Sequence, residues 1–373
     1  MNNKNDTGIY IHVPFCVQKC AYCDFYSVED LKLVEDYLTA LEGEIQLAAE
    51  AYGKISVDTL YVGGGTPTIL TEKHLSRILN ALYNAFDMSC VAESTIECNP
   101  GTINTIKARE LRKLSFNRVS IGIQSFCDNE LKGLGRIHTS LDAVDALKMV
   151  KEAGFERINA DFMFAIPGQT VESLIENLTS AIDLGVKHLS VYGLTAEKGT
   201  PFDGMVKRRE IIMPREELYE ASFLKTHDFL AEKGFLHYEI SNYAVPGEES
   251  LHNLNCWRGR DYIGFGPAAH SRMGSVRMGN VRDIREYLIN PYKKAFINEV
   301  DDSEKRMELF MLRLRTSEGI TLQGMSESAK IHELVKKGLI ETEGNTLRLT
   351  KTGMMLIDEI ILILEEEECL ILK

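Results

Sequence analysis

The 373-residue sequence lacks a long apolar run, and this absence bears on where the protein can work. A transmembrane helix needs about 20 predominantly apolar residues. The most apolar stretch, residues 354–364, is interrupted by Asp358 and Glu359. The first eight residues are polar and show no apolar core of a secretory signal. We therefore expect a cytoplasmic protein without a membrane span, in which residues 354–364 form an amphipathic or docking helix.

Positive charge and cysteine are also scarce. Lys and Arg total 42 against 55 Asp and Glu, which gives a formal net charge of −13. Because nonspecific nucleic-acid binders are normally basic, we expect no nucleic-acid partner. Eight cysteines in 373 residues are far below the density of a small disulfide scaffold. In a reducing compartment, clustered cysteines more often bind metal or perform redox chemistry.

Short β-branched or aromatic runs alternate with longer segments of helical period as far as residue 192. The expected strands are residues 8–13, 57–62, 94–98, 118–123, 157–164 and 188–192. The expected helices are residues 29–51, 72–86, 103–114, 140–153 and 171–184. Six strand–helix units in succession imply an α/β protein with a parallel sheet, either open or closed into a barrel. A parallel barrel places its chemistry on the loops that follow the strands.

The rhythm changes after about residue 236. A further strand is expected at 238–243, and a glycine-rich segment covers 259–279. Helical pattern resumes at 304–315, and residues 332–349 follow a helix, turn and strand pattern that resembles a small winged helix. We expect two domains, a core over residues 1–235 and a smaller α+β region over residues 236–373.

Three cysteines follow the first expected strand directly. Cys16, Cys20 and Cys23 have the spacing CxxxCxxC, so their thiolates can converge in one loop. Thiolates suit iron–sulfur clusters or zinc. A structural zinc site normally has four protein ligands, and no fourth cysteine lies nearby. Two interpretations stay open: a four-iron cluster with one iron left open, or a zinc site completed by a distant residue such as His12.

Polar or glycine residues also follow the later strands. Residues 63–68 read GGGTPT, in which glycines permit a close backbone approach to a ligand, although a plain tight turn would also explain them. Four polar side chains occur at or just beyond the ends of three later strands: Glu97, Gln124, Arg136 and Asp161. Each alone could be a satisfied polar group. Together they supply the carboxylates, amide and guanidinium that a cofactor with a ribose diol, an ammonium and a carboxylate requires.

The cysteine spacing resembles that of the radical SAM superfamily, and residues 10–16, YIHVPFC, resemble the opening of its HemN/HemW branch. This resemblance covers about residues 8–192. It implies a partial (β/α)6 TIM-like barrel that binds a [4Fe–4S] cluster through Cys16, Cys20 and Cys23. It further implies that S-adenosylmethionine chelates the open iron and is cleaved by one electron to a 5′-deoxyadenosyl radical. The positions carried over to the S-adenosylmethionine site are Tyr10, Tyr22, Gly64, Gly65, Thr66, Glu97, Gln124, Arg136 and Asp161.

Two features distinguish the branches of this family. The HemN type, an oxygen-independent coproporphyrinogen III oxidase, has a longer extension before the cluster and an additional cysteine two residues after the third. Here Cys16 comes early, and Phe25 occupies the position of the additional cysteine. Both features favour the HemW type, a heme-binding chaperone. Oxidative decarboxylation of coproporphyrinogen III by the radical is the alternative activity.

Residues 252–257, HNLNCW, resemble the HNxxYW segment of HemW proteins, whose histidine is implicated in heme binding. His252, Asn253 and Trp257 match, and Cys256 replaces the tyrosine. The resemblance implies His252 as a heme ligand, since imidazole is a normal axial ligand of heme iron. Trp257 could then stack on the macrocycle, and Cys256 is either a second iron ligand or a small apolar filler. A loop histidine bonded to backbone is the simpler alternative for His252, and His270 is a further polar candidate.

The resemblance also implies partners. Heme would be a bound cargo delivered to acceptor proteins such as respiratory cytochromes, and a cluster-dependent homodimer is expected. A third interpretation is a zinc-bound structural or DNA-binding module. It predicts a colourless protein that contains zinc and no iron.

Overall fold

The structure is a computed structural model that describes residues 7–323, 328–365 and 371–372 of the chain. Six parallel strands form its centre and lie side by side in chain order. They are β1 (Thr7–Val13), β2 (Val57–Gly64), β3 (Glu93–Cys98), β4 (Arg118–Gln124), β5 (Arg157–Phe164) and β6 (His188–Gly193). All seven residues of β4 are buried, as expected for a parallel strand covered on both faces. The prediction of a partial (β/α)6 barrel is confirmed.

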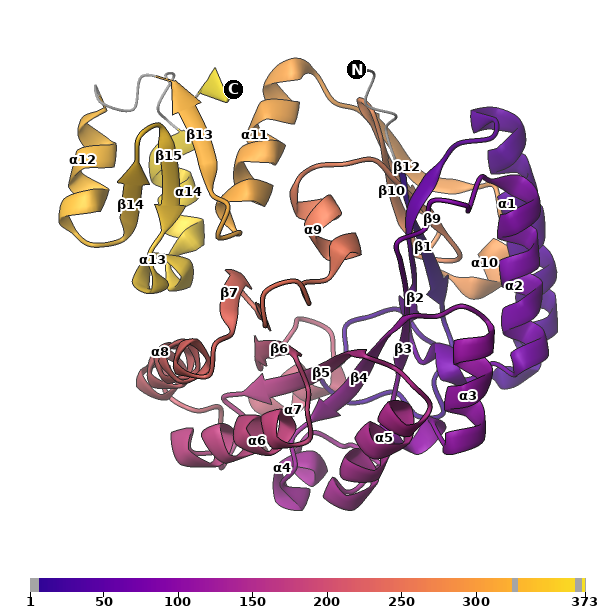
Figure 1. Cartoon of the computed structure of the whole chain (residues 1–373), viewed down its shortest axis with the longest axis horizontal. Helices are drawn as coiled ribbons and strands as arrows, with labels where there is room; N and C mark the ends of the chain where they lie inside the picture. Colours follow the sequence, from indigo (N-terminus) through magenta and orange to yellow (C-terminus); the bar gives the residue numbers. More distant parts are fainter. Residues whose placement is uncertain (1–6, 324–327, 366–370, 373) are drawn as a thin grey trace.

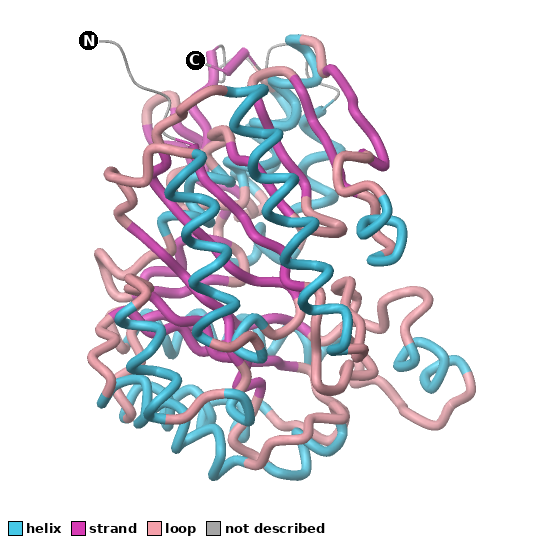
Figure 2. Tube along the Cα trace, turned by 90° about the vertical axis from the view of Figure 1, so that its right-hand side faces the viewer, coloured by secondary structure: helices cyan, strands magenta, loops and turns pink. Residues whose placement is uncertain are grey.

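Helices cover the outer face of these strands (Figure 1). The main ones are α1 (Val34–Tyr52), α2 (Glu72–Ala85), α3 (Thr105–Lys113), α5 (Ser140–Glu152) and α6 (Val171–Asp183). Side chains that accept a hydrogen bond from the first turn cap four of them: Thr71, Asn104, Thr139 and Thr170. Figure 2, which views the side of the molecule where α1 and α2 lie, shows helices packed over the strands.

Three shorter or later helices complete the barrel wall and were not predicted. They are α4 (Asp128–Gly133), α7 (Pro201–Lys207) and α8 (Glu216–Glu232). The first helix also begins later than residue 29, because Asp30 caps a separate short 3-10 turn, η1 (Leu31–Leu33), before α1. Similar 3-10 turns, η2 (Pro67–Ile69) and η3 (Pro100–Thr102), follow β2 and β3 and begin at proline.

The sheet extends beyond the barrel at both edges and reaches twelve strands. At one edge, β9 (Tyr262–Phe265) pairs in parallel with β1, and β10 (His270–Met273), β11 (Val276–Asn280) and β12 (Lys294–Glu299) continue antiparallel. At the other edge, β8 (Asn242–Ala244) and β7 (Leu236–Glu239) follow β6. The single strand expected at 238–243 was wrong: a turn at Ile240 and Ser241 divides that segment into two strands of a hairpin.

A small α+β unit follows the large sheet. Its strands are β13 (Ile320–Gln323), β14 (Ile340–Glu343), β15 (Thr346–Leu349) and β16 (Ile371–Leu372). Its helices are α11 (Asp302–Leu314), α12 (Ala329–Lys336), α13 (Lys351–Met355) and α14 (Ile357–Glu365). Figure 1 shows this unit beside the open side of the barrel. The division at residue 235 stays a prediction, and within the sheet β7 to β12 continue the barrel.

The apolar segment 354–364 does not form one helix. Leu356 separates α13 from α14, and both helices bury apolar side chains of the small unit, among them Met354, Ile357, Ile360 and Leu364. The apolar face of this segment therefore packs against other residues of the same chain. Across the described residues, we find no helix with the length and apolar content needed to span a bilayer.

Candidate functional site

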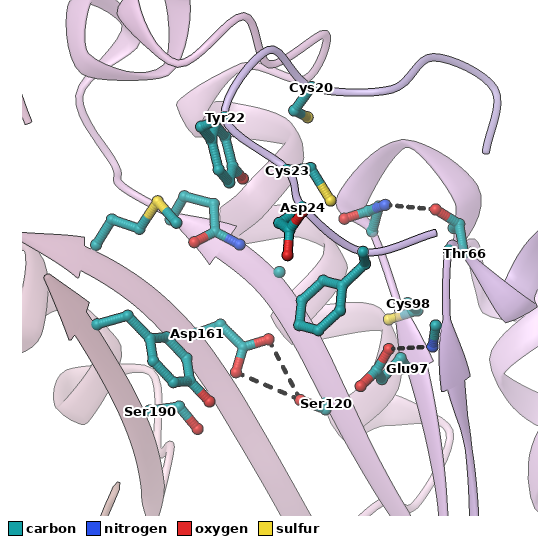
Figure 3. A pocket seen from close by; sticks show the side chains of 18 of the residues that line it. Cys20, Tyr22, Cys23, Asp24, Thr66, Glu97, Cys98, Ser120, Asp161 and Ser190 are labelled. Carbon is teal, nitrogen blue, oxygen red and sulfur yellow. Dashed lines mark hydrogen bonds between the residues drawn. The ribbon is translucent and has the colours of Figure 1, made fainter. Parts of the chain in front are cut away.

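The cysteine loop lies over the carboxyl end of the barrel strands. Cys16, Cys20 and Cys23 all line one cavity of about 510 Å³. Figure 3 shows Cys20, Tyr22 and Cys23 on the loop above the cavity and Glu97 and Asp161 on strands below it. The cavity also includes Gln18, Lys19, Asp24 and Phe25 of the same loop.

The GGGTPT segment holds the start of this loop in place. The amide of Thr66 donates to the carbonyl of Phe15 at 2.7 Å, and the amide of Gly65 donates to Val13 at 2.8 Å. A Cβ atom at Gly65 would lie 2.5 Å from the carbonyl oxygen of Phe15, so no larger residue fits there without movement. The glycine therefore permits two loops to pack backbone against backbone.

The donor set fits a cluster better than a single ion. Among the described residues, no group of three His, Cys, Asp or Glu side chains is close enough to hold one metal ion. A cubane cluster has no such need, since each cysteine binds a different iron. Both ring nitrogens of His12 are engaged, Nδ1 with the Tyr10 hydroxyl at 3.0 Å and Nε2 with the Tyr26 carbonyl at 2.9 Å. His12 therefore has no free nitrogen for the zinc site considered above.

Hydrogen-bond donors point at the cysteine sulfurs. The Thr66 hydroxyl lies 3.7 Å from Sγ of Cys16, and Nη1 of Arg136 lies 3.5 Å from Sγ of Cys20. Such donors stabilise thiolates and tune a bound cluster. Burial raises the pKa of the Cys23 thiol, so ionisation of this residue would require a bound metal to offset the cost.

Arg136 connects the cysteine loop to two strand ends. Its Nη2 donates to Oδ1 of Asn99 at 2.6 Å and to the Gly122 carbonyl at 2.7 Å. Asn99 in turn donates to the Thr66 hydroxyl at 2.8 Å. Nε of Arg136 is buried and has no hydrogen-bond partner in the part of the chain described. This guanidinium thus keeps a donor for a bound cofactor.

Glu97 is fixed at the end of β3 by two donors. The Tyr61 hydroxyl donates to Oε1 at 2.7 Å, and the Gly64 amide donates to Oε2 at 3.0 Å. Burial, with a smaller effect of the nearby Asp161 charge, raises the pKa of Glu97 to about 7. A carboxyl group held in this way can accept hydrogen bonds from a ribose diol or an ammonium group.

Asp161 begins a buried polar chain along the barrel interior. Its carboxylate accepts from Nδ2 of Asn159 at 2.7 Å and from the Ser120 hydroxyl at 3.3 Å. Burial raises the pKa of Asp161 to about 6. Oδ1 of Asn159 lies 2.6 Å from Nδ1 of His188, whose Nε2 lies 2.7 Å from the Tyr238 hydroxyl.

Most of the expected cofactor residues meet in this cavity. Its lining includes Cys16, Cys20, Cys23, Tyr22, Gly64, Gly65, Thr66, Glu97, Gln124, Arg136 and Asp161. Gln124 adopts a left-handed backbone (φ 68°) where β4 ends, which is unusual for a residue other than glycine. Tyr10 is the exception, since it does not line the cavity and its hydroxyl is bonded to His12. The role of each residue toward a cofactor stays a prediction.

Several lining residues were not predicted from the sequence. They include Tyr61, Asn99, Arg118, Ser120, Asn159, His188, Ser190 and Tyr192. Except for Asn99, which follows β3, they lie on strands among β2 to β6 and alternate with buried apolar residues, which is the period-2 signal of side chains facing a barrel interior. That alternation could have identified them, since polar residues at inward positions are unusual in a packed barrel.

The HNLNCW segment forms a short helix, α9 (Leu251–Trp257), in the concave side of the sheet (Figure 1). Ser250 and Asn253 line the cavity, and His252 does not. His252 is 5% exposed, with Nδ1 3.0 Å from the Thr59 hydroxyl and its ring against Tyr61. Burial lowers the pKa of His252 to about 4, so the imidazole is neutral at pH 7. A neutral imidazole is the form that binds iron.

The other candidate heme-site residues, Trp257, Cys256 and His270, lie in different surroundings from His252. The guanidinium of Arg315 lies 5.0 Å from the centre of the Trp257 ring and covers one of its faces, so that face is not open to a stacked macrocycle. Burial raises the pKa of Cys256 to about 12, which favours the thiol over a thiolate ligand. His270 is exposed on β10, where its ring contacts Phe296, and it does not line the cavity.

Comparisons of the sequence and the fold with known proteins support a radical SAM site at this cavity. The family model of the radical SAM superfamily matches residues 10–181. The chain is 33% identical to the heme chaperone HemW of Bacillus subtilis, across 94% of this chain and 97% of that protein. It is also 33% identical to the heme chaperone HemW of Escherichia coli, across 95% and 97%. The solved structure of the radical SAM enzyme HemN, coproporphyrinogen III oxidase from E. coli, superposes with a TM-score of 0.83 at 23% identity, across 97% of this chain and 91% of that chain.

Fold, cysteine loop and matched segment together define a radical SAM protein, a class that uses a [4Fe–4S] cluster and S-adenosylmethionine. Within this class, the identity to two HemW proteins over nearly their whole length is decisive. The chain belongs to the HemW family.

Proposed function

We propose that this protein is a heme chaperone that binds heme at α9 and delivers it to acceptor proteins. Relatives at 33% identity over nearly their full length are named heme chaperones. The cysteine loop, Glu97, Arg136 and Asp161 offer the donors and acceptors that a cluster and S-adenosylmethionine need. When bound, these groups supply one-electron chemistry.

One observation carries the proposal. The α9 segment, which resembles the heme-binding segment of HemW proteins, contributes Ser250 and Asn253 to the wall of the cofactor cavity. His252 lies between them in the chain and is a neutral imidazole. Among the described residues, its side chain is hydrogen-bonded only to the Thr59 hydroxyl, at 3.0 Å. Nε2 makes no hydrogen bond to the described residues, so this nitrogen would bind iron while Nδ1 keeps its bond to Thr59.

Spectroscopy of heme binding tests the proposal. We expect heme to give a shifted Soret band with the anaerobically reconstituted protein, and the His252→Ala variant to lose most of it. Cys256→Ser and His270→Ala serve as matched controls and should behave like the wild type. The absence of a Soret shift in the wild type, or an identical shift in His252→Ala, would contradict the assignment of His252.

Coproporphyrinogen III oxidation is the alternative activity, favoured by the superposition with HemN. Phe25 argues against it, because it replaces the additional cysteine of the oxidase pattern. Its side chain is 69% exposed and lies at the mouth of the cavity. Anaerobic formation of protoporphyrinogen from coproporphyrinogen III would establish the oxidase.

Three finer statements are part of the proposal and need tests of their own. They are a cytoplasmic location, respiratory cytochromes as acceptors and a cluster-dependent homodimer. Cell fractionation tests the location, and co-purification with heme-free acceptors tests the partners. The mass in solution with and without reconstituted cluster tests the homodimer.

A further inference from the structure

The cavity has a second end, far from the cysteine loop along the barrel axis. Arg118 and His188, the first residues of β4 and β6, line this end together with Ser250 and Asn253. The cysteines lie at the opposite ends of the strands. The cavity therefore extends through the barrel from the cofactor loop to α9.

Arg118 is unusual among the buried arginines. The residue is 2% exposed, and its side chain makes one hydrogen bond to the residues that the structure describes, from Nη1 to the carbonyl of Glu248 at 3.1 Å. No ion-pair partner of Arg118 occurs among the residues that the structure describes. Arg272, which is also buried, faces Glu308 at 3.1 Å. The partly buried Arg157 faces Glu93 at 3.0 Å.

A guanidinium carries five N–H donors, and burying its charge without a counter-ion is costly. The carboxylates of this region are already engaged. Glu93 is bonded to Arg157 and to the start of α9, and Asp161 is bonded to Asn159 and Ser120. Asp161 is near enough for its charge to interact with that of Arg118, but no carboxylate of the described residues forms an ion pair with this guanidinium. Arg118 therefore presents an unpaired guanidinium to a cavity wall, which suits a planar anion bound by two parallel hydrogen bonds.

We propose that Arg118 is the anchor of a carboxylate-binding site at the α9 end of the cavity, and that a heme propionate occupies it. This inference rests on the proposed function and deepens it. Arg118 is bonded to Glu248, four residues before His252 in the same segment, so one segment presents the iron ligand and positions the carboxylate anchor. A carboxylate of S-adenosylmethionine has the same chemistry and is the competing source.

Heme and its dimethyl ester, in which both propionates are blocked, separate the possibilities. We expect the wild type to bind heme about tenfold to a hundredfold more tightly than the dimethyl ester, the range for a charge-assisted pair. Arg118→Gln should reduce heme affinity to the level of the ester and leave ester affinity unchanged. Arg118→Lys keeps the positive charge but loses the planar pair of N–H donors, so its heme affinity should lie between those of the wild type and Arg118→Gln. Arg285→Gln, on an exposed arginine of α10 (Ile284–Ile289), is the matched control.

The contrary outcomes are distinct. Equal affinity of the wild type for heme and the ester, or an equal loss of both in Arg118→Gln, would overturn the propionate site and make Arg118 a structural support of the Glu248 loop. If Arg118→Gln loses S-adenosylmethionine affinity and keeps heme affinity, the carboxylate is that of the cofactor and the heme assignment is overturned. If the wild type binds no heme, the chaperone proposal fails, and unchanged S-adenosylmethionine binding in Arg118→Gln would then overturn the carboxylate site as well.

Discussion

Glu97 and Asp161 are two carboxyl groups inside one barrel, and burial keeps both protonated to higher pH than usual. The pKa of Glu97 is raised from 4.5 to about 7 and that of Asp161 from 3.8 to about 6. Both groups are therefore partly neutral near pH 6.5 in the cofactor-free chain. A bound cation or a set of hydroxyl donors would draw them toward the ionised state.

This burial predicts a pH dependence of stability. Because the folded chain keeps a proton on Glu97 that the unfolded chain releases between about pH 4.5 and 7, the free energy of unfolding falls as pH rises through that window. Glu97→Gln removes this term, which is of the order of 3 kcal/mol. Urea denaturation of the cofactor-free chains at pH 5 and pH 8 should show a smaller loss in the variant. Equal losses in the two chains would contradict the assignment.

The cysteines of the cavity differ in what they can bind. Cys16, Cys20 and Cys23 lie on the loop, whereas Cys98 lines the same cavity from β3, where burial raises the pKa of its thiol strongly. We expect Cys20→Ser to lose most of the bound iron and Cys98→Ser to keep it. Iron and sulfide content after anaerobic reconstitution measures this. Equal iron in the two variants would show that the loop does not bind the cluster.

At the scale of elements, α9 depends on an acidic cap from a distant strand. Glu93 of β3 accepts from the amides of Leu251 and His252, each at 3.0 Å, and pairs with Arg157. So short a helix is marginal by itself, and besides Glu93 it is held by the Ser250 cap and by the hydrogen bonds of His252 to Thr59 and Asn255 to Asp58. Glu93 of β3 is thus one of several contacts that position α9.

Replacing this cap should loosen α9. Glu93→Gln leaves Arg157 without its close partner, and breaking a buried pair costs about 3 kcal/mol. We expect a lower free energy of unfolding, weaker heme binding and a red shift of the Trp257 emission, which reports α9 alone because the chain has one tryptophan. Asp283→Ala removes the exposed cap of α10 and should change only stability, by about 1 kcal/mol. An unchanged emission and heme affinity in Glu93→Gln would contradict this role.

The elements that the sequence predicted well share a physical signal. The six barrel strands are buried on both faces, so their apolar runs are long and their ends lie within two residues of the expected bounds. The β7–β8 hairpin was mistaken for one strand, because Ile240 at its turn is apolar and carries no glycine or proline signal. Polar composition concealed α9, since its stability comes from Glu93, which lies 157 residues from Ser250 in the chain.

The site shows the same contrast. Cys16 and Glu97 could be predicted because they lie just after or at the end of a strand, and Arg136 because it lies in the connection between β4 and β5, where a parallel barrel concentrates its chemistry. Arg118 could not, because a charged residue that begins a strand is ordinary in sequence. Its importance comes from three-dimensional facts, namely its burial, its missing counter-ion and its proximity to the segment before α9.

At the scale of the whole molecule, charge limits the partners. The net charge of −13 repels the phosphate backbone of nucleic acids. The small α+β unit beside the barrel carries no excess of positive charge that could offset this repulsion. We expect no binding of a 30-base-pair duplex at about 0.15 M salt in an electrophoretic mobility assay. A saturable shift at that ionic strength would revive the DNA-binding interpretation.

The proposed function would place two tasks at the two ends of one cavity. The cysteine loop and the strand ends form the cofactor end, and α9 with Arg118 forms the other. The small α+β unit contacts this region through Arg315, which lies over Trp257 and pairs with Glu239 at 3.0 Å.

Transfer of heme to an acceptor tests the chaperone function most directly. Wild-type protein loaded with one equivalent of heme is mixed anaerobically with a heme-free respiratory cytochrome, with His252→Ala and an equal amount of free heme as controls. We predict that the wild type fills the cytochrome faster than free heme does, and that His252→Ala, which does not load, gives no more than free heme. Retention of heme by the wild type, or equal rates for wild type and His252→Ala, would contradict the proposal.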